Sequence, residues 1–146
     1  MQRAHITPYA LTYTAWYLGL TVLIAFIFAL LAWPGGMGTI LLIILAATAR
    51  AARRFVHEHA RVPHTAEVQA YAWRALVGAF LASLLITLPI AFFVLPAQET
   101  QEIFANFKSL EYVVVGLVVL ALFAAAYYAV IRIGFVWSAK QFLRRF

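Results

Sequence analysis

The polar residues of this chain gather in a few short segments and leave four long apolar runs between them. These runs cover approximately residues 9–33, 37–56, 70–95 and 111–136. About 20 residues of α-helix cross the roughly 30 Å hydrocarbon core of a bilayer. Each run is near that length. The pattern therefore predicts an all-α membrane protein, in which residues 1–146 form a single four-transmembrane-helix bundle.

The second run gives the weakest evidence of a membrane crossing. Its purely apolar part, Met37 to Ala49, has only 13 residues, so a crossing must borrow the stretch that contains Arg50, Arg53 and Arg54. Long arginine stems lie along apolar surface while their guanidinium groups reach the headgroups. A re-entrant hairpin is the alternative. The third run contains Pro89, which predicts a kink that serves either gating or packing.

Lysine and arginine predict the orientation of these runs. With four crossings, ten of the eleven basic residues lie on one side, and Lys108 alone lies on the other. Basic residues mark the cytoplasmic side of a membrane protein. The distribution predicts an N-in, C-in topology with a basic cytoplasmic loop over 57–69 and an acidic outer loop over 96–110. It also disfavours the re-entrant hairpin, which would move the basic loop outside.

Apolar residues recur at helical spacing in the outer loop, at Ile103, Phe104, Phe107 and Leu110, and predict a short interfacial helix. Aromatic residues near the ends of the first run, among them Trp16 and Tyr17, are typical of the headgroup layer. Small residues recur four apart within the runs. They favour close helix packing, either inside the bundle or across a homodimer.

Composition narrows the possible functions. Of the residues 66% are apolar, 11% are charged and none is cysteine, which excludes disulfides and thiolate metal sites. The basic residues flank apolar runs, so we expect them to face anionic lipid headgroups, and we expect no nucleic acid partner. No ionisable side chain lies near the centre of a run, and this argues against haem binding and against cation-coupled export.

The remaining polar residues are concentrated between Arg50 and Arg74. His57, Glu58 and His59, followed by His64, have the chemistry of zinc ligands. On a continuous helix, however, His57 and His59 lie about 200° apart, so the spacing predicts no metal site and no cofactor.

A positive stripe is predicted on the same helix, from Arg50, Arg54, His57 and Arg61, and it suits anionic headgroups. We expect Pro63 to end that helix. Thr65 is then placed to cap the next helix, with Glu67 in its first turn.

The residues Phe55, Val56, His59, Arg61, Pro63 and Glu67 spell F-V-x-x-H-x-R-x-P-x-x-x-E. In a chain of this length the motif resembles a family of small, uncharacterised bacterial inner-membrane proteins. The resemblance implies a multi-pass protein of the bacterial inner membrane with His59, Arg61 and Glu67 clustered at the cytoplasmic mouth of the bundle. The alternative is that these residues simply join two helices through hydrogen bonds and a salt bridge. It implies no activity. The candidate interaction cluster comprises Arg50, Arg54, His57, His59, Arg61 and Glu67.

These observations favour a non-enzymatic accessory or interaction subunit with no catalytic residue. Its basic cytoplasmic loop would contact anionic lipid, a larger membrane complex or a second copy of the chain. A small transporter or channel component is the first alternative, with the Pro89 kink and the hydroxyls of Thr21, Ser83 and Thr87 forming a polar path. A membrane enzyme that uses the loop histidines is the second alternative.

Overall fold

Four helices form the part of the chain that the computed structural model describes, namely residues 5–31, 36–93, 101, 105 and 110–144. The helices are α1 (Thr7–Leu31), α2 (Met37–His59), α3 (Thr65–Phe93) and α5 (Leu110–Leu143), and no strand occurs among these residues. They correspond to the four predicted runs. α3 continues through Pro89, whereas the predicted interfacial helix of the outer loop falls mostly outside the described residues.

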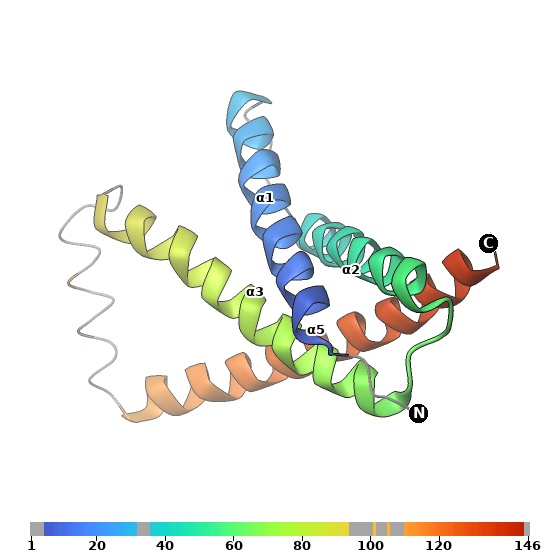
Figure 1. Cartoon of the computed structure of the whole chain (residues 1–146). Coiled ribbons are helices and arrows are strands. Elements are labelled where there is room, and N and C mark those ends of the chain that lie inside the picture. The colour runs from blue at the N-terminus through green and yellow to red at the C-terminus, as the bar shows by residue number, and fades with distance from the viewer. Residues whose placement is uncertain (1–4, 32–35, 94–100, 102–104, 106–109, 145–146) are drawn as a thin grey trace.

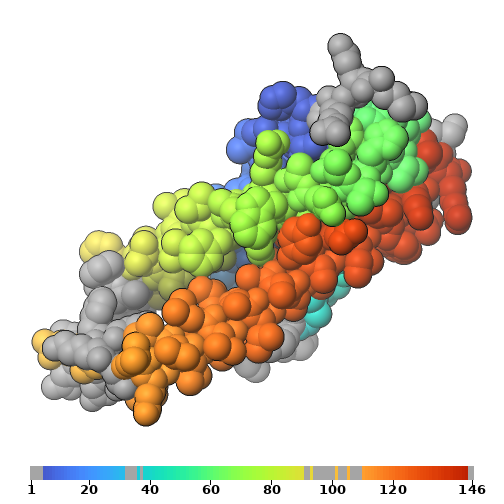
Figure 2. Space-filling view, turned by 90° about the horizontal axis from the view of Figure 1, so that it is seen from below, coloured from blue at the N-terminus to red at the C-terminus, as the bar shows by residue number. Residues whose placement is uncertain are grey.

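The helices converge on one shared region and diverge away from it (Figure 1). α1 packs against α2 and α3, and α5 packs against the same two helices, so that α1 and α5 lie across from each other. Figure 2 shows α5 lying along α3 on the face turned toward the viewer.

Contacts between α1 and α2 give the direction of this pair. The Tyr9 and Phe55 ring centres are 5.3 Å apart. Seven residues further along α1, the guanidinium of Arg50 lies 5.3 Å from the centre of the Trp16 ring. The residue number in α2 therefore falls as the residue number in α1 rises. α1 and α2 are therefore antiparallel.

α3 runs in the same direction as α1. Arg74 donates a hydrogen bond to Thr7, and Tyr17 is hydrogen-bonded to Ser83, so both residue numbers rise together. α5 runs the opposite way to α3, as Figure 1 shows. The N-termini of α1 and α3 and the C-termini of α2 and α5 consequently share one end of the molecule, here called the polar end (Figure 1).

The core lies toward the polar end. Aromatic rings interlock there across all four helices, with Tyr71 of α3 stacked 3.9 Å from Phe135 of α5. Alanines between the rings allow the backbones to approach closely. Those that are completely buried are Ala47, Ala51, Ala52, Ala72, Ala75 and Ala139. The small residues Ala75, Ala79 and Ala82 of α3 thus face the interior, whereas Ala15 and Gly19 of α1 are exposed.

Beyond the core the helices expose apolar side chains over most of their length. α1, α3 and α5 are each long and apolar enough to cross a membrane. By length and composition, these three helices suggest a membrane protein. α2 is not among these candidates because its second half carries Arg50, Arg53, Arg54 and Glu58.

The connection between α2 and α3 differs from its prediction at both ends. α2 ends at His59, and Ala60 caps it in the left-handed region at φ 49°, three residues before Pro63. α3 begins at Thr65, with the carbonyl of His64 accepting the first helical hydrogen bond from Val68 at 2.9 Å. The N-cap is therefore His64 rather than Thr65. The Glu67 carboxylate accepts the His64 backbone N–H at 2.9 Å and fixes this start.

Candidate functional site

A hydrogen-bond network at the polar end joins α1 to α2. Arg54 donates through Nε to the Glu58 carboxylate at 2.9 Å and through Nη1 to the Thr12 hydroxyl at 2.8 Å. The Tyr9 hydroxyl donates to the other carboxylate oxygen of Glu58 and lies 3.1 Å from Nε2 of His59. These bonds hold the pKa of Glu58 below its ordinary value, the hydrogen bond from Tyr9 acting most strongly and that from Arg54 next.

A second network closes the connection between α2 and α3. Arg61 forms a bidentate ion pair with Glu67, with nitrogen-to-oxygen distances of 2.8 and 2.7 Å. Only 3% of the Glu67 side chain is exposed, against 32% for Arg61. The hydrogen bond from Arg61 to this carboxylate raises the pKa of the guanidinium. A buried carboxylate held this way stabilises one conformation of the connection.

Phe55 lies between the two networks and is completely buried. Its ring is 4.7 Å from the His59 ring and 5.9 Å from the Phe135 ring, each edge to face. The Arg61 guanidinium lies 5.4 Å from the Phe55 ring centre. The motif residues therefore share a packing role. Arg61 and Glu67 meet directly, whereas His59 is hydrogen-bonded to Tyr9 of α1.

The predicted positive stripe is only partly formed. Arg50, Arg54 and His57 lie exposed on α2, but Arg61 lies beyond its end, because the chain leaves the helix at the left-handed Ala60. Arg50 also packs its guanidinium over the Trp16 ring. Much of the predicted interaction cluster thus contacts the protein itself.

The loop histidines do not form a ligand set in the described residues. His57 and His64 are exposed, and His59 is half-buried against Phe55. Within the described ranges no three histidine, aspartate or glutamate side chains are placed to hold a metal ion.

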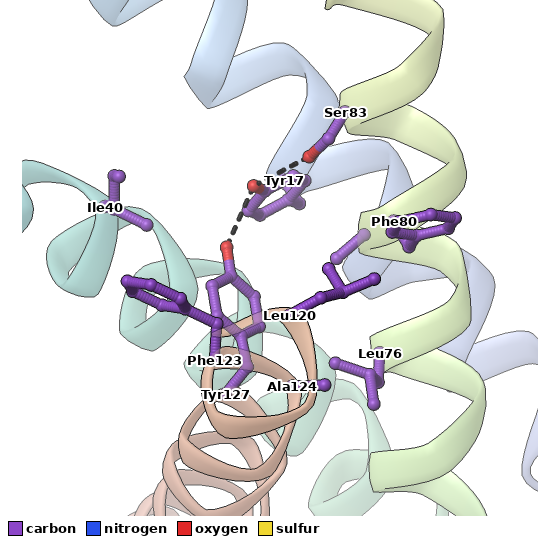
Figure 3. A pocket seen from close by; sticks show the side chains of 10 residues that line it. Tyr17, Ile40, Leu76, Phe80, Ser83, Leu120, Phe123, Ala124 and Tyr127 are labelled. Carbon is purple, nitrogen blue, oxygen red and sulfur yellow. Dashed lines mark hydrogen bonds between the residues drawn. The ribbon is translucent and has the colours of Figure 1, made fainter. Parts of the chain in front are cut away.

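Sequence reasoning missed a second feature, an open cavity of about 280 Å³ that is lined by residues from all four helices. Three hydroxyls line it in a chain (Figure 3). Tyr127 donates to Tyr17 at 2.9 Å, and Tyr17 is bonded to Ser83 at 3.3 Å, which links α5, α1 and α3. The remaining lining is apolar, from side chains such as Phe80 and Phe123.

The predicted polar path through the helices coincides with this cavity at one residue. Ser83 lines it, but Thr21 donates to the Tyr17 carbonyl of its own helix at 2.7 Å, and Thr87 is exposed. Tyr17, expected in the headgroup layer, is 7% exposed and faces inward. The spacing of Tyr9, Tyr13 and Tyr17, each one helical turn from the next, is the signal in the sequence that marks this inward face.

Several basic side chains at the polar end remain exposed. They lie on three helices: Arg53 of α2, Arg74 of α3, and Arg132, Lys140 and Arg144 of α5 or its end. The described part of the chain holds two carboxylate ion pairs, Arg54 with Glu58 and Arg61 with Glu67. The five exposed residues belong to neither pair and form what we call the basic surface.

Comparison of this chain with known protein families, curated proteins and solved structures finds no match. The resemblance carried by Phe55 to Glu67 therefore stays a prediction.

Proposed function

We propose that this chain is a four-span protein of the bacterial inner membrane with both termini in the cytoplasm. The directions of the helices support this placement. If α1 and α3 cross the membrane in the same direction, the segment between them must return the chain to its starting side. α2 has 23 residues, and at about 1.5 Å per residue it is some 34 Å long, enough for that return.

The charge distribution supports the same placement. The basic surface belongs to the polar end, together with the α2 to α3 connection and the ends of α1 and α5. Basic residues favour the cytoplasmic side. Arg50 and Arg54 extend from the end of α2 nearest this surface, so their long side chains reach headgroups from within the span.

Within that membrane the protein acts as an accessory or interaction subunit, and the basic surface is its contact. One observation carries this proposal. The charged residues of the α2 to α3 connection are bound internally, Arg61 to Glu67 above all, whereas the basic surface on the flanking helices has no carboxylate ion pair among the described residues. We therefore place the proposed contact on the flanking helices and not on the α2 to α3 connection.

Purification of the tagged chain from its native membranes tests this role. We expect a stoichiometric partner with the wild-type chain and its loss from the Arg53→Glu/Arg132→Glu variant. Leu122→Gln, an exposed change away from the polar end, is the matched control and should keep the partner. A chain that elutes alone, or a partner indifferent to both charge reversals, would contradict the role.

The hydroxyl-lined cavity supports a second candidate, a small transporter component. Tyr17, Ser83 and Tyr127 supply the polar groups such a path needs in apolar surroundings. Proton flux into liposomes that hold the purified chain distinguishes the two roles. The transporter predicts flux above that of empty liposomes and a loss of flux in Tyr17→Phe, and an accessory subunit predicts no flux in either.

A further inference from the structure

A groove of about 510 Å³ lies between α1 and α3 and is lined by residues of these two helices alone. Its walls repeat every three or four residues on both helices. Leu11 and Leu18 supply one wall, and Val77 and Leu85 supply the other. Because α1 and α3 run in the same direction, these rows line the same groove from its two sides.

One end of the groove is cationic. Arg74 lies there exposed and donates a hydrogen bond to the Thr7 hydroxyl at 3.0 Å. Neither of the two carboxylate ion pairs in the described residues involves Arg74, so its charge has no acidic neighbour bound to it. The hydroxyl proton of Thr7 is free to donate alongside the guanidinium, because its oxygen accepts the bond from Arg74. Together they suit a phosphate oxygen.

The length of the groove matches one leaflet of a bilayer. From Thr7 to Leu18, and likewise from Arg74 to Leu85, the groove extends over eleven residues, or about 16 Å at about 1.5 Å per residue. Half of a roughly 30 Å hydrocarbon core is about 15 Å. An acyl chain that starts at Arg74 therefore reaches the far end of the groove near the bilayer midplane.

We propose that this groove binds one anionic phospholipid, with its phosphate against Arg74 and Thr7 and one acyl chain along the groove. The head of the groove carries a cation and a hydroxyl, and the remainder is apolar, which is the order of polarity in a phospholipid. The inference rests on the proposed placement of the polar end at the cytoplasmic headgroup layer. It goes further by assigning one lipid to one site.

Native mass spectrometry of the full chain in detergent, titrated with phosphatidylglycerol or phosphatidylcholine, tests the site. We expect one tightly held phosphatidylglycerol, and about tenfold weaker binding in Arg74→Gln, the loss of one charged hydrogen bond. Arg74→Lys keeps the positive charge at the head of the groove and should bind phosphatidylglycerol nearly as well as the wild type does. Millimolar inorganic phosphate should not displace the lipid, because phosphate lacks the acyl chain.

A second pair of variants tests the apolar part of the groove. Val77→Trp fills the groove and should weaken phosphatidylglycerol binding severalfold, whereas Val115→Trp, an exposed position of α5, should not. Equal loss in Arg74→Gln and Arg74→Lys, equal affinity for phosphatidylcholine, or displacement by phosphate would overturn the proposal. Labelling of the two sides of the membrane decides the placement separately, so either claim can fail while the other stands.

Discussion

Arg61 binds both carboxylate oxygens of Glu67, at 2.8 and 2.7 Å, across the connection that joins α2 to α3. The same carboxylate accepts the backbone N–H of His64 at the start of α3. One buried side chain therefore fixes the loop and caps the helix. Two residues of the predicted interaction cluster, Arg61 and Glu67, thus bind each other.

Glu67→Gln should destabilise the protein by about 2 kcal/mol, since it removes the charge from bonds to a guanidinium in a buried position. Gln can still accept the His64 N–H, so the loss reports mainly on the ion pair. The free energy of unfolding, measured by denaturant titration in mixed micelles, checks this. Arg53→Gln, at an exposed position, should stay within about 0.5 kcal/mol of the wild type. A Glu67→Gln variant as stable as Arg53→Gln would show that the pair contributes nothing.

Acid should weaken the network between α1 and α2. The pKa of Glu58 is lowered in the folded protein by Tyr9 and Arg54, from an ordinary value of 4.5. A depressed carboxyl pKa contributes stability that is fully present above the unfolded value and is lost as the pH falls through the folded one. Stability should therefore fall below about pH 4.5 in the wild type and fall less in Glu58→Gln.

The size of this acid effect is limited because the Glu58 side chain is 40% exposed. We expect less than about 1 kcal/mol, after allowing for screening by solvent. Thermal unfolding midpoints across the acid range provide the measurement. If the wild type and Glu58→Gln lost stability in parallel, the Tyr9 and Arg54 bonds would not be linked to folding.

Gly78 of α3 lies close against α1. A Cβ placed there would lie 2.0 Å from Oγ1 of Thr14, a hydroxyl that donates to the Ala10 carbonyl at 3.0 Å. Gly78→Ala should cost about 1–3 kcal/mol of stability through overpacking. Thr14→Ala in the same chain should restore most of it. Gly116→Ala is the matched control, because nothing lies within 4 Å of a Cβ there, and an unaffected Gly78→Ala variant would refute the close packing.

The hydroxyl chain of the cavity should contribute measurably to stability. Tyr17→Phe removes two hydrogen bonds and Tyr127→Phe removes one. Side-chain hydrogen bonds within membranes average about 0.6 kcal/mol, so we expect about 1 kcal/mol for the first variant and about half of that for the second. Tyr112→Phe, with a side chain 65% exposed, should be neutral. Equal stability of all three variants would show that the chain of hydroxyls does not contribute to the stability of the protein.

The helices were predictable because long apolar runs leave few alternatives to a helix in a membrane. The end of α2 was not. Ala60 adopts the left-handed conformation that glycine usually occupies, so no turn residue marks the point where the helix stops. Arg61 was consequently assigned to the α2 stripe, although it lies beyond the helix and pairs with Glu67.

The inward face of α1 was hidden for a different reason. A helix that is apolar all round gives little indication of which side meets lipid and which meets protein. Tyr17 was therefore predicted to lie in the headgroup layer, from its position next to Trp16. It is instead buried and hydrogen-bonded to Tyr127. Only the packing of the four helices distinguishes the exposed Trp16 from the buried Tyr17.

The crossing of α2 is the point on which the proposed function depends, and the natural absence of cysteine makes it directly measurable. Gly36→Cys and His64→Cys place single exposed thiols just before and some five residues beyond α2. In intact spheroplasts a membrane-impermeant maleimide should label residue 36 and should label residue 64 only after the membrane is permeabilised. Labelling of both thiols from the same side would show that α2 does not cross, and would contradict the four-span, N-in and C-in protein proposed here.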